Sequence, residues 1–98
     1  MVVDDEESVR FSFELALADE GYDVMGAADY NSALSLISKA EPDLIITDIL
    51  LGRFSGIDFF KEVRKQGLQC PVIMITGAPD IQTSREAVRL GAFDYIPK

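Results

Sequence analysis

Leu44-Ile45-Ile46-Thr47-Asp48 is an apolar stretch that ends on a carboxylate, and its pattern decides the fold class. Three other apolar stretches of the chain also end on polar side chains. They are residues 1–3 before Asp4 and Asp5, residues 72–75 before Thr76, and residues 94–97 before Lys98. If the four stretches are parallel strands, these polar groups meet at the carboxyl edge of one sheet, where open α/β sheets bind ligands.

Segments with helical periodicity separate these stretches, and the alternation predicts an α/β fold with a parallel sheet covered on both faces. A further short strand is expected at residues 22–25. In the strand order 2-1-3-4-5, counted along the chain, strands 1, 3 and 4 end within about 10 Å of one another, because neighbouring strands lie about 4.8 Å apart. Helices are expected from Asp5 to near Gly21, from Asp29 to before Pro42, from about residue 57 to Gly67, and from Asp80 to about Leu90.

The composition is that of a single globular domain. The chain has 98 residues, of which 48% are hydrophobic and 27% charged, and this balance excludes a disordered or fibrous protein. No apolar stretch approaches the roughly 18 residues of a membrane span, and no basic segment leads into a signal-peptide core, so we expect a cytoplasmic protein. The net charge of −8 should repel nucleic acid and anionic lipid, and we expect no direct contact with either.

Two residue counts narrow the chemistry. Cys70 is the only cysteine, which excludes a disulfide within the chain, and we expect it to be an inert, partly buried thiol. The chain has no histidine, so the commonest general base and metal ligand is absent.

The expected polar edge carries three carboxylates, a hydroxyl group and an ammonium group. Taken singly, each has an ordinary explanation, because an acidic pair often caps a helix and the others can be turn or surface residues. Three close carboxylates repel one another, and a divalent cation offsets this repulsion; oxygen ligands favour Mg²⁺ over zinc. An oxygen nucleophile beside a metal, a hydroxyl and an ammonium group suits phosphoryl transfer. Asp48 is the predicted acceptor, because the other groups flank it on both sides.

The chain resembles the receiver domains of bacterial two-component response regulators over essentially its whole length. The resemblance rests on the acidic pair in VVDDE, the D-x-x-x-x-x-x-x-G stretch from Asp48 to Gly56, the hydroxyl in IMITG, and the final GAFDYIPK. The last stretch is especially similar to receivers of regulators that activate σ54-dependent transcription. The resemblance implies a flavodoxin-like, doubly wound parallel sheet of five strands in a phosphoprotein of signal transduction.

The resemblance also implies a role for each matching acidic residue. Asp48 would accept the phosphoryl group. A Mg²⁺ ion would be bound directly by Asp5, by Asp48 and by the backbone carbonyl of Leu50, and through water by Asp4.

The resemblance implies roles in catalysis and switching for three more residues. Thr76 would bind a phosphoryl oxygen and shift when it arrives, and Lys98 would form an ion pair with the phosphoryl group. Tyr95 would be an aromatic switch whose ring turns inward behind Thr76. Without the resemblance, we would expect Tyr95 to be a half-buried aromatic residue of a strand.

Some positions depart from the family pattern. Leu50 and Ala78 flank the predicted phosphoryl site and offer no side-chain hydrogen bond to an attacking water, so we expect slow autodephosphorylation. Gly52 stands where many relatives have proline, and this should loosen the loop that follows Asp48.

The family usually continues past the final lysine into a fifth helix that packs beside the first. We therefore expect residues 1–98 to be a receiver domain shortened at its C-terminus and slightly at its N-terminus. The first helix carries an apolar stripe of Val9, Phe13, Ala16 and Leu17 at the spacing of one buried face. Without a fifth helix, we expect part of that stripe to be exposed or covered by a second copy in a homodimer.

Three functions fit the sequence. The first is a phosphorylation-controlled switch that takes its phosphoryl group from a sensor histidine kinase or a small phosphodonor and acts on an output domain or transcription machinery beyond the chain end. The second is a receiver-like module that binds proteins without phosphorylation. The third, a Mg²⁺ phosphohydrolase with an aspartyl nucleophile, lacks a general acid two positions after Asp48, where Leu50 stands. The complete set of five polar groups favours the first.

Overall fold

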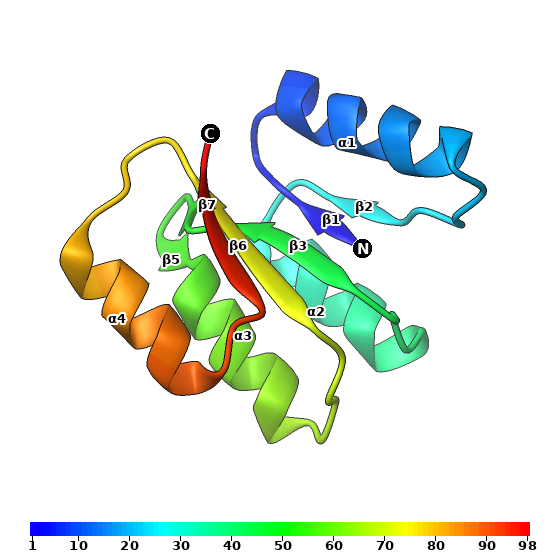
Figure 1. The fold of residues 1–98 in the computed structure, drawn as a ribbon. Coiled ribbons are helices and arrows are strands. Elements are labelled where there is room, and N and C mark those ends of the chain that lie inside the picture. The colour runs from blue at the N-terminus through cyan, green and yellow to red at the C-terminus, as the bar shows by residue number, and fades with distance from the viewer.

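A five-stranded parallel sheet forms the centre of the molecule, with α2, α3 and α4 on one face and α1 on the other (Figure 1). The computed structural model describes all residues 1–98. The strand order is β2-β1-β3-β6-β7, which confirms the predicted fold class. The elements are β1 (Val2–Val3), α1 (Glu7–Asp19), β2 (Gly26–Ala27), α2 (Tyr30–Lys39), β3 (Ile45–Asp48), β4 (Leu50–Leu51), β5 (Phe54–Ser55), α3 (Gly56–Lys65), β6 (Val72–Thr76), α4 (Ile81–Leu90) and β7 (Asp94–Pro97).

The second strand of the sheet lies later in the chain than predicted. The sequence placed it at residues 22–25, and that placement is wrong, because β2 comprises Gly26–Ala27. Hydrogen bonds from Val2 N to the Met25 carbonyl and from Asp4 N to the Ala27 carbonyl set this register. Pairing with the short strand β1 therefore determines which residues form β2, and the apolar pattern of residues 22–25 does not predict them.

Side-chain caps begin three of the helices. Asp29 and Asp80 each accept a hydrogen bond from a backbone N–H in the first turn of α2 and α4, as the sequence predicted. Ser55 begins α3 with a reciprocal capping box, in which its hydroxyl and the Asp58 carboxylate each accept a backbone N–H. Gly91 ends α4 in the left-handed conformation, at φ 88°.

The stretch after Asp48 forms a small antiparallel hairpin, β4 and β5, where the sequence predicted only a loop. Its turn passes through Gly52 at φ 66°. The hairpin returns the chain to Gly56, where an added Cβ would collide with the carbonyl oxygen of Asp48. The start of α3 therefore packs directly on the backbone of Asp48.

The hydrophobic core lies between the sheet and the helices α2 and α3. Phe59, Phe60 and Val63 of α3 are completely buried against Ile45 and Met74 of the sheet.

Helix α1 contributes no buried residue. The predicted stripe is only partly correct, because Ala16 is exposed whereas Val9, Phe13 and Leu17 are half-buried. No other helix lies beside α1 on this face of the sheet to cover them (Figure 1). None of the helices combines the length and apolar character needed to cross a bilayer.

Candidate functional site

Four strands deliver the predicted polar residues to the carboxyl edge of the sheet. Asp4 follows β1, Asp48 ends β3, Thr76 ends β6, and Lys98 follows β7. Asp4, Asp48 and Thr76 are buried. The structure brings Asp4, Asp48 and Lys98 into direct contact and places Thr76 on the strand beside Lys98.

Lys98 is the centre of the charged contacts. Its Nζ lies 2.9 Å from Asp48 Oδ2, 3.0 Å from Glu6 Oε1 and 3.1 Å from Asp4 Oδ2. Burial of the ammonium group lowers the pKa of Lys98, but its close contacts with the carboxylates of Asp48, Glu6 and Asp4 outweigh burial and raise the pKa above its ordinary value. Lys98 is therefore a fixed positive charge beside the carboxylate of Asp48.

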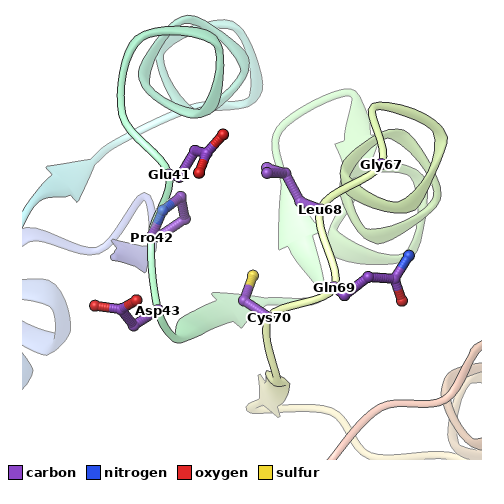
Figure 2. A pocket seen from close by; sticks show the side chains of 7 residues that line it. All are labelled: Glu41, Pro42, Asp43, Gly67, Leu68, Gln69 and Cys70. Atoms are coloured by element: carbon purple, nitrogen blue, oxygen red, sulfur yellow. The ribbon is translucent and has the colours of Figure 1, made fainter.

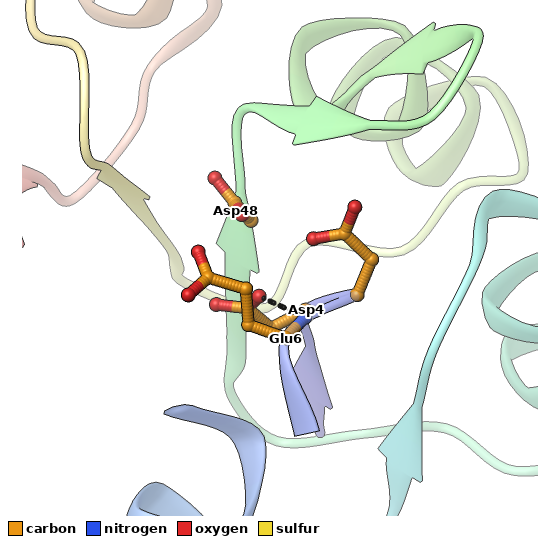
Figure 3. A group of neighbouring side chains, drawn as sticks. Asp4, Glu6 and Asp48 are labelled. Carbon is orange, nitrogen blue, oxygen red and sulfur yellow. Dashed lines mark hydrogen bonds between the residues drawn. The ribbon is translucent and has the colours of Figure 1, made fainter. Parts of the chain in front are cut away.

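Asp4 holds a carboxylate oxygen that is buried without a hydrogen-bond partner. Asp4 Oδ1 accepts the backbone N–H of Glu6 at 2.8 Å (Figure 3). Asp4 Oδ2 accepts no hydrogen bond, because Lys98 Nζ approaches it at 3.1 Å as an ion pair without hydrogen-bond geometry. Burial raises the pKa of Asp4, an effect that the Glu6 N–H and Lys98 only partly oppose. A buried carboxylate oxygen without a hydrogen bond is costly unless cations offset its charge, and here one ammonium group is shared with Glu6 and Asp48.

The surrounding carboxylates fit a divalent metal ion. Asp4, Asp5, Glu6 and Asp48 each offer a carboxylate oxygen, and these oxygens lie within 4.8 Å of one another. Figure 3 shows Asp4, Glu6 and Asp48 gathered at the ends of β1 and β3. Hard oxygen ligands of this kind suit Mg²⁺, and the Asp4 oxygen that accepts no hydrogen bond supports the fit.

The carboxylate of Asp48 is held at both oxygens. Oδ1 accepts the Leu50 backbone N–H at 3.2 Å, and Oδ2 accepts from Lys98. The neighbouring Thr47 hydroxyl donates to the Asp48 carbonyl oxygen at 3.0 Å. Together with the close packing of Gly56, these contacts fix the end of β3.

Thr76 and Tyr95 are not in contact through hydrogen bonds in this structure. Thr76 Oγ1 accepts the Ala78 backbone N–H at 3.0 Å. The Tyr95 hydroxyl instead lies at the start of α4, 2.8 Å from Thr83 Oγ1, and it accepts the Asp80 backbone N–H at 3.3 Å. The ring of Tyr95 is half-buried.

Sequence reasoning missed two residues of this region. Glu6 contacts Lys98, and the run of acidic residues after Asp5 was a signal that could have found it. Thr83 contacts Tyr95, and nothing in the sequence indicates this pairing, because it joins α4 to β7 across the fold.

A shallow cavity of about 370 Å³ lies at the opposite edge of the sheet, before β3 and β6. Figure 2 shows its lining, which includes Pro42, Leu68 and Cys70. Its charged lining residues, Glu41 and Asp43, have the same sign. The chemistry therefore gathers at the carboxyl edge and not in this cavity. Cys70 is free and half-buried, as predicted.

The fold and the acidic edge together define a class of α/β domains that bind ligands where the strands end. The chain belongs to the response regulator receiver domain family, which matches residues 1–98. The family expected from the sequence is thus confirmed.

Relatives of known name support this assignment. The chain is 37% identical over 98 residues to the regulatory protein AtoC of Escherichia coli, covering 100% of this chain and 21% of AtoC. The receiver domain of NtrX from Brucella abortus has a TM-score of 0.90 and 40% identity, covering 99% of this chain and 82% of that one.

A third relative is a solved structure with a modified residue and bound groups. It is a response regulator from Burkholderia pseudomallei with a phosphorylated aspartic acid, a calcium ion and citrate, with a TM-score of 0.91 and 30% identity, covering 99% of this chain and 57% of that one. The chain spans 21–41% of the length of the sequence relatives it matches.

Proposed function

We propose that this receiver domain is a phosphorylation-controlled switch in which Asp48 accepts a phosphoryl group. The observation that carries the proposal is the contact between Lys98 Nζ and Asp48 Oδ2, beside an oxygen of Asp4 that is buried and accepts no hydrogen bond. This arrangement places a buried carboxylate nucleophile next to a fixed positive charge and a set of metal-binding oxygens. The phosphorylated aspartic acid of the Burkholderia pseudomallei relative supports it.

In the proposed reaction, a carboxylate oxygen of Asp48 forms a bond to phosphorus, and the bond from phosphorus to the donor breaks. The donor is the phosphohistidine of a sensor histidine kinase, or a small acyl phosphate. The leaving histidine nitrogen or carboxylate oxygen keeps the electron pair. Lys98 balances the charge of the phosphoryl oxygens, and the Thr76 hydroxyl, at the end of the neighbouring strand, binds one of them.

Asp5, Asp48 and the backbone carbonyl of Leu50 would hold a Mg²⁺ ion, with Asp4 acting through water. The ion supplies charge neutralisation for the transferring phosphoryl group. Asp5 is exposed and Asp4 is buried, so the pair offers one accessible ligand and one fixed acceptor for a water molecule.

In the proposed switch, Tyr95 transmits phosphorylation to the surface of the domain. We propose that phosphorylation draws Thr76 toward the phosphoryl group and that the ring of Tyr95 turns inward behind it, which changes the surface of α4 and β7. Because the chain matches only part of its longer relatives, we propose that this surface controls an output domain or a second receiver.

The test is the intact mass of the chain after incubation with acetyl phosphate, with and without Mg²⁺. We expect one phosphoryl adduct that requires Mg²⁺ and disappears in Asp48→Ala. Asp23→Ala removes an exposed carboxylate away from the site and should keep the adduct. A folded wild-type chain without an adduct would instead indicate a module that binds proteins independently of phosphorylation.

A further inference from the structure

The hydroxyl group of Tyr95 ties β7 to the first turn of α4. It lies 2.8 Å from Thr83 Oγ1, and the Asp80 backbone N–H donates to it at 3.3 Å. We propose that Thr83 is a positioning residue that holds Tyr95 in this orientation and thereby opposes the phosphorylated conformation. The inference rests on the proposed function, in which the ring turns toward Thr76.

Helix α4 fixes the Thr83 hydroxyl in place. The Thr83 backbone N–H donates to the capping carboxylate of Asp80 at 2.8 Å, so the residue belongs to the anchored first turn. Its branched side chain has few rotamers in a helix. The other contact of the hydroxyl, to the Asp80 carbonyl oxygen, is long at 3.4 Å. Tyr95 is therefore the main partner of this hydroxyl group.

One side of the ring is open. A depression of about 360 Å³, lined by Pro79, Asp80, Ile81, Ser84, Arg85 and Tyr95, adjoins it, so packing does not enclose the ring on this side. Turning the ring toward Thr76 gives up the hydrogen bond to Thr83. A neutral hydrogen bond shifts an equilibrium by roughly two- to tenfold. Loss of the Thr83 hydroxyl should therefore favour the phosphorylated conformation by about that factor.

The experiment measures the affinity of the chain for beryllofluoride, a mimic of the phosphoryl group, at saturating Mg²⁺, by amide NMR titration. Thr83→Val removes the hydroxyl and keeps the branched shape, and we expect it to bind beryllofluoride roughly two- to tenfold more tightly than the wild type. Thr83→Ser keeps a hydroxyl and should restore wild-type affinity. Ser84→Ala removes the neighbouring hydroxyl and is the matched control, because the hydroxyl that pairs with Tyr95 is that of Thr83.

A double-mutant cycle isolates the pair. Tyr95→Phe removes this hydrogen bond together with the one from the Asp80 N–H, so adding Thr83→Val to Tyr95→Phe should cause no further change. If Thr83→Val does not fold, the beryllofluoride affinity of Tyr95→Phe tests the inference instead. Wild-type affinity in Thr83→Val, or additive effects in the cycle, would overturn the inference and leave the proposed function standing. A wild-type chain that binds no beryllofluoride would overturn both.

Discussion

Lys98 sets the charge balance of the acidic site at the scale of single residues. One ammonium group contacts the carboxylates of Asp4, Glu6 and Asp48, so negative charge remains in excess. The raised pKa of Lys98 keeps this cation charged at neutral pH. The remaining negative charge is available to a divalent metal ion. Single substitutions can test how much each carboxylate contributes.

Glu6 should contribute to metal affinity. Its carboxylate belongs to the group of oxygens within 4.8 Å of one another, whereas Glu7 is exposed and outside it. We expect Glu6→Gln to weaken Mg²⁺ binding by roughly threefold, because it removes one nearby, partly screened negative charge. Isothermal titration with Mg²⁺ measures the change. Glu7→Gln is the control, because it removes the same charge from a neighbouring residue. Equal Mg²⁺ affinities in Glu6→Gln and Glu7→Gln would contradict the prediction.

Asp4 should make stability depend on pH in the absence of metal. Burial raises the pKa of Asp4 in the folded chain above its ordinary value of 3.8, so the folded chain binds this proton more tightly than the unfolded chain. Stability is therefore lost as the pH rises through the raised pKa. We expect Asp4→Asn, which has no charge to bury, to raise the free energy of unfolding at pH 7.

Urea unfolding in the presence of a chelator, repeated between pH 4 and 7 as an approximate range around the shift, measures this effect. The difference between Asp4→Asn and the wild type should shrink toward the acid end. Added Mg²⁺ should stabilise the wild type more than the variant, because ligand binding to the folded state adds to its stability. An Asp4→Asn chain less stable than the wild type at neutral pH would refute the account.

Leu50 should slow the loss of the phosphoryl group. Its side chain is 59% exposed beside the site and cannot orient an attacking water. We expect Leu50→Asn to speed dephosphorylation roughly tenfold, since an amide can hydrogen-bond that water. The decay of the phosphoryl adduct by intact mass gives the rate. Leu50→Ala removes the leucine side chain without adding an amide. A similar dephosphorylation rate in Leu50→Asn and Leu50→Ala would exclude a role for the amide.

At the scale of elements, the connection from β3 to α3 positions Asp48, the proposed acceptor. The hairpin β4–β5 and the start of α3 bring Gly56 against the Asp48 carbonyl oxygen. Helix caps such as Asp29 and Asp80 could be predicted from the sequence, because the cap is a local preference. The hairpin could not, because its strands are two residues each and carry no periodic pattern.

Gly56 should be intolerant of a side chain. We expect Gly56→Ala to destabilise the chain by about 2 kcal/mol or more, since the added Cβ would force the Asp48 backbone to move. Gly77→Ala is the control, because its Cβ would lie 3.9 Å from the nearest atom, Lys98 Cδ. Urea unfolding compares the two. Equal losses of stability would show that the close approach does not matter.

At the scale of the whole molecule, the two faces of the sheet are unequally covered. The face with α2, α3 and α4 holds the buried core, whereas α1 lies alone on the other (Figure 1). The strand order and the meeting of Asp4, Asp48 and Lys98 could be predicted, because each polar residue follows an apolar run. The exact extent of β2 and the contacts of Glu6 and Thr83 could not, because they depend on pairing between distant segments.

The unequal faces should appear in the cost of removing aromatic side chains. Phe60 of α3 is fully buried, and we expect Phe60→Ala to cost about 3 to 5 kcal/mol. Phe13 of α1 is half-buried, and Phe13→Ala should cost about 1 kcal/mol, because less apolar area is lost. The urea midpoints of the two variants measure the difference. A similar cost at both sites would mean that α1 is covered in solution.

The contact between Lys98 and Glu6 joins residues 92 positions apart in the chain. Such a long loop closes only once the intervening strands have paired, and contacts of this kind form slowly during folding. A partly folded chain therefore holds the carboxylate of Asp48 but lacks the ammonium group beside it. Under the proposed function, phosphorylation is thus confined to molecules that have finished folding.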